Sequence, residues 1–119
     1  MSGFSPAQVA EHTGFTLDTL RYYEKEGLLG AIERTGGGRR TYSQRDLDWL
    51  NLIKCLRDTG MPIAELRRYS DLGADPSTLQ ERLDLLEAHD RAVQEDIDKL
   101  RAQQEHLREK ISWYRDQLR

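Results

Sequence analysis

The sequence predicts an all-α fold with one small β-hairpin, ending in a long coiled-coil helix. Three observations lead to this prediction: helix-capping residues recur along the chain, a triple glycine separates two short segments, and apolar residues repeat with a period of 3.5 in the C-terminal third. At 119 residues, the chain can bury only a modest core of its own. Oligomerisation is therefore expected.

A first short helix is expected over about residues 5–12. Ser5 is a suitable N-cap, Pro6 suits the first helical position, and Gln8 is placed to complete a capping box. Gly14 then supplies a C-terminal stop.

A second helix is expected from its cap at Thr16 through Glu26, with Gly27 ending it. Leu17 and Leu20 are expected to face inward. Two short helices joined by a turn around Gly14 form a candidate helix-turn-helix.

The segment LLGAIERTGGGRRTY, residues 28–42, predicts a hairpin with the triple glycine Gly36-Gly37-Gly38 at its tip. Four arginines and no acidic residue occur within residues 34–45, so this hairpin carries a basic patch. They are Arg34, Arg39, Arg40 and Arg45. A basic hairpin after a helix-turn-helix is a winged-helix arrangement.

Two more helices follow the hairpin. Ser43 is expected to cap the third, with Asp46 making the reciprocal bond, and this helix should continue to Gly60. Pro62 is expected to open a fourth helix that ends near Gly73.

The last helix is expected over residues 76–118 and carries the repeating apolar seam. Ten of the twelve seam positions are apolar, which predicts a coiled coil formed with another chain. The positions are Leu79, Leu83, Leu86, Asp90, Val93, Ile97, Leu100, Gln104, Leu107, Ile111, Tyr114 and Leu118. Folding back as a hairpin is the alternative, but no Gly or Pro interrupts residues 77–119. The predicted domains are thus a winged helix-turn-helix domain, 1–73, and a dimerising coiled-coil helix, 74–119.

Charge is divided unevenly along the chain. Residues 1–70 hold ten Lys and Arg and nine Asp and Glu, a net charge of +1, whereas residues 71–119 hold eight and twelve, a net charge of −4. The N-terminus lacks the features of a signal peptide and no run has the apolar length of a membrane span, so a cytoplasmic protein is expected. The single cysteine, Cys55, rules out an internal disulfide and argues against a thiolate metal site.

The stretch LRYYEKEGLL, residues 20–29, displays Arg21, Tyr22 and Tyr23 on the second helix of the pair. In such domains this helix enters the major groove of DNA, where arginine can bind guanine or phosphate and tyrosine hydroxyls can reach phosphate. The alternative is that one tyrosine is a core residue and Arg21 pairs with Glu24 or Glu11. Adjacent tyrosines point about 100° apart, so both cannot be core.

Arg39 and Arg40 lie beside the glycines of the hairpin tip. Glycine permits close approach of the backbone to a ligand, which favours a role as phosphate contacts over a solvated turn. Arg57, Arg67 and Arg68 either extend this basic surface or belong to solvated helix faces.

The segments LDTLRYYEKEGLL, GGRRTYSQRDLDWL and CLRDTGMPIAELRRY, followed by the coil, resemble the MerR family of bacterial transcription regulators over essentially the whole chain. Cys55 in IKCLRDTGMPI and the ERLDLLEAH opening of the coil are most similar to the AdhR-like and NmlR-like branch, which responds to aldehydes and other electrophiles. The resemblance implies a homodimer with an antiparallel coiled coil. Such a dimer binds an inverted repeat in promoter DNA and, when activated, bends and untwists an over-long spacer for RNA polymerase.

The resemblance also implies roles for individual residues. Thr16, Arg21 and Tyr22 match recognition-helix contacts, and Tyr23 matches a packing or phosphate tyrosine. The wing contacts that it implies are Arg39, Arg40 and Tyr42. Asp18 departs from members that carry a basic residue at this position.

The residues predict DNA binding and offer one candidate for sensing a signal. Cys55 is the one possible sensor thiol, but between Ile53 and Leu56 it is equally suited to a buried packing role. Lys54 and Arg57 would favour its thiolate if they lie close to it. The three histidines, His12, His89 and His106, are scattered and are expected at the surface, and no metal or cofactor is expected.

Other classes of function explain fewer of these features. An enzyme is disfavoured because no phosphate-binding loop and no nucleophile-base set occurs in the sequence. A coiled-coil structural adaptor leaves the basic hairpin and the capped helix pair unexplained. A DNA-binding repressor or architectural protein without an effector keeps every DNA contact and removes only the role of Cys55.

Overall fold

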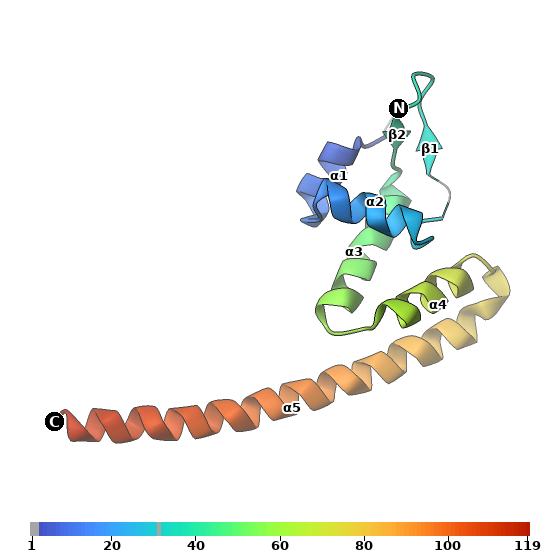
Figure 1. Ribbon diagram of the computed structural model, residues 1–119. Helices are drawn as coiled ribbons and strands as arrows, with labels where there is room; N and C mark the ends of the chain where they lie inside the picture. The colour runs from blue at the N-terminus through green and yellow to red at the C-terminus, as the bar shows by residue number, and fades with distance from the viewer. Residues whose placement is uncertain (1–2, 31) are drawn as a thin grey trace. The chain divides into compact units, whose positions relative to one another are not determined.

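The computed structural model describes residues 3–30 and 32–119, and its mostly helical fold with one two-stranded hairpin confirms the predicted fold class (Figure 1). The elements in chain order are α1 (Pro6–Thr13), α2 (Leu17–Lys25), β1 (Glu33–Arg34), β2 (Arg40–Thr41), α3 (Gln44–Asp58), α4 (Ile63–Gly73), the 3-10 turn η1 (Pro76–Thr78) and α5 (Leu79–Gln117). The chain divides into two compact units, Met1–Leu83 and Asp84–Arg119.

Side-chain caps start the first two helices where the sequence predicts them. Ser5 Oγ accepts a hydrogen bond from the Gln8 backbone N–H at 3.2 Å, and Gln8 Oε1 accepts one from the Ser5 N–H at 2.9 Å. Gly14 ends α1 in the left-handed conformation, with φ of 80°. Thr16 Oγ1 then accepts from the Thr19 N–H at 3.1 Å and caps α2. The predicted helix-turn-helix is confirmed.

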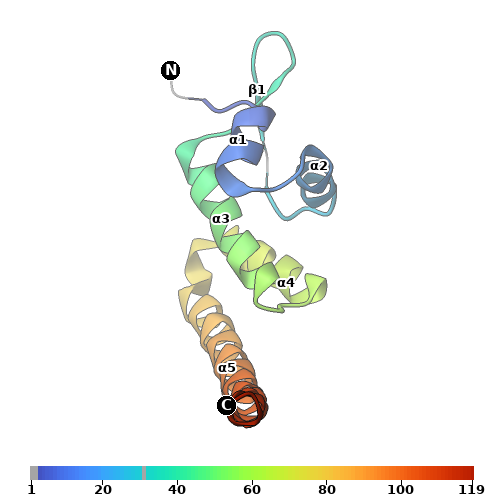
Figure 2. The same cartoon turned by 90° about the vertical axis from the view of Figure 1, so that its left-hand side faces the viewer.

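The core of the N-terminal unit lies between α1, α2, α3 and α4 (Figure 2). Its most deeply buried side chains come from all of these helices and from the segments after α2 and β2. They are Val9, Leu20, Leu28, Tyr42, Leu50, Ile53 and Leu66.

The predicted inward orientation of Leu17 is wrong. Leu20 and Tyr23, one turn apart, form the buried face of α2, whereas Leu17 is 42% exposed. Leu17 lies one turn further toward the helix N-terminus, where it lines a surface groove together with Pro6 and Tyr42.

The hairpin pairs Glu33 with Thr41 and Arg34 with Arg40 in antiparallel register. Its tip contains the triple glycine, as predicted, and Gly38 adopts a φ of 81°. Arg34 Nη1 donates to the Gly38 carbonyl at 2.9 Å, so this arginine stabilises the tip of its own hairpin.

Helix α3 begins with the predicted reciprocal caps: Ser43 Oγ accepts from the Asp46 N–H at 3.0 Å, and Asp46 Oδ2 accepts from the Ser43 N–H at 2.9 Å. Helix α4 is tied to the end of α2 by side chains. Ser70 Oγ donates to the Leu28 carbonyl at 3.1 Å, and Arg67 forms an ion pair with Glu26. The segment that follows α2 is therefore attached to α4.

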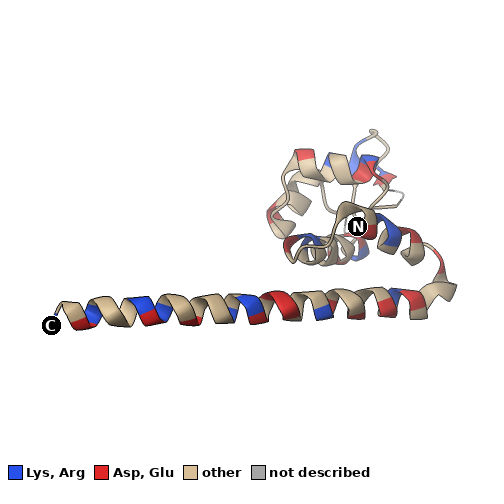
Figure 3. Cartoon of the chain, turned by 60° about the horizontal axis from the view of Figure 1, so that its bottom comes forward, with Lys and Arg blue, Asp and Glu red and all other residues tan. Residues whose placement is uncertain are grey.

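Helix α5 is continuous from Leu79 to Gln117, so the alternative of a fold-back hairpin is excluded. It has no buried residue within the described chain, and apolar seam residues such as Leu100, at 66%, are strongly exposed. Charged residues of both signs occur along its length (Figure 3). No helix in the described part of the chain is both long enough and apolar enough to cross a membrane.

Candidate nucleic-acid interface

Helix α2 presents Arg21 and Tyr22 at its surface and Tyr23 in the core. Tyr22 is 48% exposed and Tyr23 is 4% exposed. The Tyr23 ring packs edge-on against Phe15, with centroids 5.4 Å apart. Sequence reasoning that only one of the two tyrosines can be core is thereby confirmed, and Tyr23 is the packing residue.

Arg21 is available for a ligand. It forms no ion pair with any residue in 3–30 or 32–119, so its predicted alternative partners Glu11 and Glu24 do not hold it. Glu24 pairs instead with Arg40 of the wing. Arg21 is therefore an exposed cation on the face of α2 that carries Tyr22.

A groove of about 280 Å³ brings the predicted DNA-contacting elements together. Its walls are the first turn of α1, the start of α2 and the second strand of the wing. The lining residues are Ser5, Pro6, Ala7, Leu17, Leu20, Arg21, Arg39, Arg40 and Tyr42.

Two features of the groove suit a phosphate group. Arg21 and Arg39 are both exposed residues among those that line it, and Arg39 has no ion-pair partner among the residues that the structure describes. The first turn of α1 contributes the positive end of a helix dipole, while its capping box already engages the N–H groups of Ser5 and Gln8. Cationic side chains and helix N-termini are the groups that commonly bind DNA phosphates.

Arg40 has a different environment from Arg39. Its Nε lies 2.6 Å from Glu24 Oε2, and the pair is only partly exposed. The Nε atom is buried and its geometry toward Glu24 does not meet that of a hydrogen bond, so the contact is an ion pair by distance alone. Arg40 was predicted as a phosphate contact, but its main contact here attaches the wing to α2.

Tyr42 is a core residue, with 1% of its surface exposed. Burial raises the pKa of its hydroxyl above the ordinary value of 10.0, and the carboxylate of Glu24 raises the pKa further. Its backbone exchanges two hydrogen bonds with that of Phe4: each N–H donates to the other residue's carbonyl at 2.8 Å. The buried ring does not support the predicted wing contact of this side chain with DNA.

Thr16 and Asp18 both lie at the start of α2. Thr16 is exposed and its hydroxyl already caps the helix, so a DNA contact would share an oxygen that also stabilises α2. Asp18 is exposed in the same turn, where a negative charge interacts favourably with the helix dipole. The negative charge of Asp18 therefore stabilises the start of α2.

Cys55 is exposed on α3 and is not a packing residue. The two cations predicted to act on its thiol bind a carboxylate instead: Lys54 Nζ and Arg57 Nη2 lie 2.9 and 2.8 Å from the oxygens of Asp58. Arg57 also lies over the Phe15 ring, 4.9 Å from its centroid. Among the described residues, no group of three or more His, Cys, Asp or Glu could hold a metal ion.

Sequence reasoning missed the contribution of α1 to this surface. The sequence identifies Ser5 and Pro6 only as helix-start residues, yet they form part of one wall of the groove. The capping signal that locates the start of α1 also locates the positive end of its dipole, so it could have revealed this wall.

Comparison with known proteins identifies the family of this fold. The profile of the MerR HTH family regulatory protein matches residues 4–72, and the MerR DNA-binding profile matches residues 47–110. The chain belongs to the MerR family. As the sequence predicts, it is a MerR-type DNA-binding transcriptional regulator and not an enzyme.

Two curated relatives differ in how much of their length the chain matches. An uncharacterized HTH-type transcriptional regulator of Haemophilus influenzae is 36% identical over 114 residues, covering 93% of this chain and 83% of the relative. The HTH-type transcriptional regulator AdhR of Bacillus subtilis is 40% identical over 81 residues, 67% of this chain. The match spans 58% of the length of AdhR.

A solved MerR-family structure is similar over nearly the whole fold. HiNmlR, a MerR family regulator lacking the sensor domain and bound to promoter DNA, has 34% sequence identity and a TM-score of 0.88. The similarity covers 97% of this chain and 92% of HiNmlR.

Proposed function

We propose that this MerR-type regulator binds an inverted repeat in promoter DNA as a homodimer, with α2 and the wing of each protomer contacting one half-site. The observation that carries the proposal is the groove that brings Arg21 of α2, Arg39 of the wing and the first turn of α1 to one surface. The similarity to a regulator bound to promoter DNA supports promoter DNA as the ligand.

Within this surface, Arg21 and Tyr22 contact the major groove and Arg39 contacts the phosphate backbone. Thr16 contributes from the start of the recognition helix while capping it. Arg40 and Tyr42 support the wing rather than contact DNA, because Arg40 is paired with Glu24 and Tyr42 is buried. In this proposal, Arg39 is the wing side chain that contacts DNA.

Dimerisation through α5 follows from its exposed seam. The helix is about 58 Å long at 1.5 Å per residue, and none of its residues is buried in the described part of the chain. A second copy of the same seam is the occupant that a period of 3.5 favours. In this arrangement, Asp90 and Gln104 are the polar seam positions that favour one register.

The charge distribution of α5 favours an antiparallel pair. Residues 79–98 hold seven acidic and two basic residues, whereas residues 99–117 hold five basic and three acidic residues. An antiparallel dimer places each acidic half beside a basic half, and a parallel dimer places like charges together. The coil direction implied by the family resemblance thus has an independent electrostatic reason.

The dimer would act on DNA shape rather than by catalysis. Bending and untwisting an over-long promoter spacer would allow RNA polymerase to engage both promoter elements. Cys55 is the proposed sensor of aldehydes, other electrophiles or oxidants, since its thiol is exposed on α3. An effector-independent repressor or architectural protein is the second candidate, and the same exposed thiol favours the regulated form over it.

Salt-dependent binding to the DNA upstream of the protein's own gene tests the interface. Affinity should fall steeply as salt rises, and Arg21→Ala and Arg39→Ala should each weaken binding. Arg39→Ala should reduce the salt slope by about one, as expected for one lost phosphate contact. Arg68→Ala, an exposed arginine outside the groove, is the matched control. Equal losses for all three variants would contradict the proposed surface.

Transcription in vitro tests the sensor. Wild type and Cys55→Ser are compared on the same promoter with and without a small reactive aldehyde. Activation of wild type alone, with unchanged DNA binding by the variant, supports Cys55 as the sensor. Identical responses leave the effector-independent regulator as the better description.

A further inference from the structure

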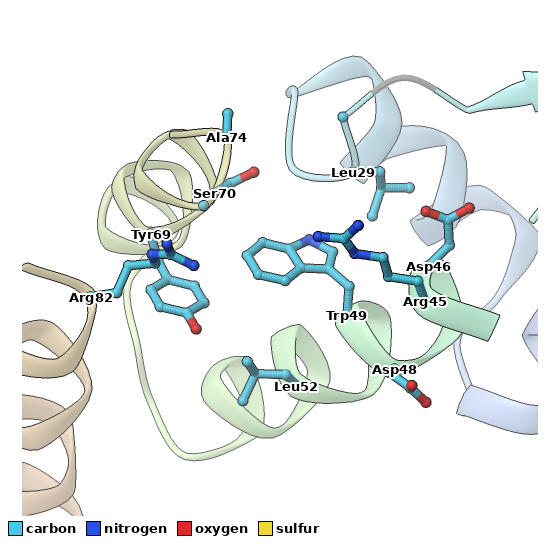
Figure 4. Close-up of a pocket in the computed structure, with 12 residues that line it drawn as sticks. Leu29, Arg45, Asp46, Asp48, Trp49, Leu52, Tyr69, Ser70, Ala74 and Arg82 are labelled. Carbon is cyan, nitrogen blue, oxygen red and sulfur yellow. The ribbon is translucent and has the colours of Figure 1, made fainter. Parts of the chain in front are cut away.

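A second concave site lies on the N-terminal unit. It shares no lining residue with the groove proposed to bind DNA. This pocket has a volume of about 470 Å³, which is within the range of small-molecule sites. It lies among the loop after α2, helices α3 and α4, and the first turn of α5 (Figure 4). These are the elements that connect the recognition helix to the C-terminal helix.

The apolar part of the pocket is a preorganised aromatic surface. The rings of Trp49 and Tyr69 are stacked, with centroids 5.3 Å apart and an angle of 6° between their planes. The Trp49 indole N–H donates to the Leu28 carbonyl at 2.7 Å, which fixes the ring. With Leu29 and Leu52 on adjoining walls, the pocket suits a flat, apolar ring.

The acidic residues of the pocket are engaged by the protein. Asp46 Oδ2 accepts the Ser43 N–H at 2.9 Å in the cap of α3. Asp48 Oδ1 accepts from Gln44 Nε2 at 2.9 Å on the outer face of the same helix. These two carboxylates therefore have partners that lie outside the pocket.

The two arginines retain donors for a ligand. Arg45 has no ion-pair partner within the described ranges of the chain. Arg82 donates from Nε to Thr78 Oγ1 at 3.2 Å and from Nη2 to the Asp75 carbonyl at 3.4 Å, which leaves further N–H groups of its guanidinium. In Figure 4, Arg45 lies on the Trp49 side of the pocket and Arg82 on the Tyr69 side.

We propose that this pocket binds a small planar aromatic carboxylate, with its ring on Trp49 and its carboxylate hydrogen-bonded to Arg45 or Arg82. Guanidinium groups beside an aromatic wall supply the charge and the apolar surface that such an anion requires. A neutral aromatic ligand leaves the guanidinium donors unused and binds more weakly. Binding itself stands apart from the proposed function; only an effect of the ligand on DNA affinity would rest on it.

Fluorine NMR with 4-fluorobenzoate tests binding to the full chain in the absence of DNA. We expect saturable broadening and shift of the fluorine resonance, and about tenfold weaker binding of the neutral 4-fluorobenzamide. The double variant Arg45→Gln/Arg82→Gln should weaken benzoate binding by about tenfold or more. Arg68→Gln/Arg101→Gln, which removes the same charge at exposed positions outside the pocket, should bind as wild type does.

A steric variant keeps the test independent of charge and of the hydrogen bonds of Arg82. Ala74 is exposed and lines the pocket, so Ala74→Leu should occupy part of it and weaken saturable binding. Circular dichroism verifies that each variant is folded. Linear, non-saturable broadening in wild type, or equal binding by wild type and Ala74→Leu, would overturn the proposal. Normal salt-dependent DNA binding by the same protein preparation, measured separately, would show that the proposed function survives that result.

Discussion

Arg40 of the wing and Glu24 of the recognition helix form an ion pair, with Arg40 Nε 2.6 Å from Glu24 Oε2. The side chains are 32% and 22% exposed, so solvent screens the pair only in part. The contact joins two of the elements that line the groove, α2 and the wing. The position of the wing relative to α2 therefore depends on it.

Removing either partner of this pair should weaken DNA binding. If Arg40 mainly bound phosphate, Glu24→Ala would release it and also remove a repelling charge, so binding would become tighter. We expect the opposite: Glu24→Ala and Arg40→Ala each weaken binding by about fivefold, corresponding to about 1 kcal/mol, and the double variant is weaker by less than the product of the two. Fluorescence anisotropy with the promoter duplex measures the change. Glu65→Ala, an exposed acid on α4, is the control, and tighter binding by Glu24→Ala alone would refute the structural role of Arg40.

Thr16 should contribute to stability as well as to DNA binding, because its hydroxyl caps α2 at 3.1 Å from the Thr19 N–H. Thr16→Ala should lower the free energy of unfolding by about 1 kcal/mol, whereas Thr16→Ser retains the cap and should lose much less. Urea denaturation monitored by circular dichroism measures both. A Thr16→Ala variant as stable as Thr16→Ser would show that the cap contributes nothing to the fold.

The features predicted correctly from the sequence depend on neighbours along the chain. A capping box links residues three apart, so Ser43 and Asp46 reveal the start of α3 without knowledge of the fold. Gly14 reveals the end of α1 for the same local reason. The seam of α5 is likewise a property of one helix and its period.

The contacts that define the wing surface depend on tertiary structure, and the sequence did not reveal them. Glu24 and Arg40 are far apart in sequence, as are Glu26 and Arg67, and only packing brings them together. Because Glu24 engages Arg40, Arg21 remains unpaired toward the described residues, which spacing alone could not decide.

The exposure of Cys55 could have been predicted from the sequence. The packing interpretation relied on its neighbours Ile53 and Leu56. At 100° per residue, however, Ile53 and Leu56 lie on one helical face, and position 55 falls nearly opposite Ile53. The buried Ile53 and Leu56 and the exposed Cys55 agree with that period. Periodicity therefore predicts the exposure of this thiol better than adjacency does.

Acid should reduce the stability of the fold partly through Asp75, the cap of η1. Hydrogen bonds donated to its carboxylate by the Ser77 backbone N–H and then the Ser77 hydroxyl hold its pKa below the ordinary 3.8. A carboxyl with a lowered folded-state pKa stabilises the fold above its unfolded value, and this contribution is lost as pH falls through the folded value. The effect is therefore expected below about pH 3.8.

Asp75→Asn tests this dependence, because asparagine can still cap a helix but does not titrate. Wild type should have the higher melting temperature at pH 7, and the difference should shrink as pH falls below 3.8. Thermal denaturation of both proteins across this range measures it. A constant difference between the two would show that ionisation of Asp75 does not contribute.

A charge placed in the seam of α5 should break the dimer. Leu100 is a seam residue that is 66% exposed in the single chain, so Leu100→Asp should fold as a helix yet bury an unpaired carboxylate in each half of a dimer. We expect dimerisation to weaken by about a hundredfold or more, corresponding to about 3 kcal/mol, in sedimentation equilibrium. Ala102→Asp adds the same charge at the outermost helical position and should remain dimeric.

If both variants remain dimeric, the subunits associate through another surface. If Leu100→Asp is monomeric and binds an isolated half-site as tightly as wild type binds it, the coil contributes by joining two half-sites rather than by shaping the recognition helix.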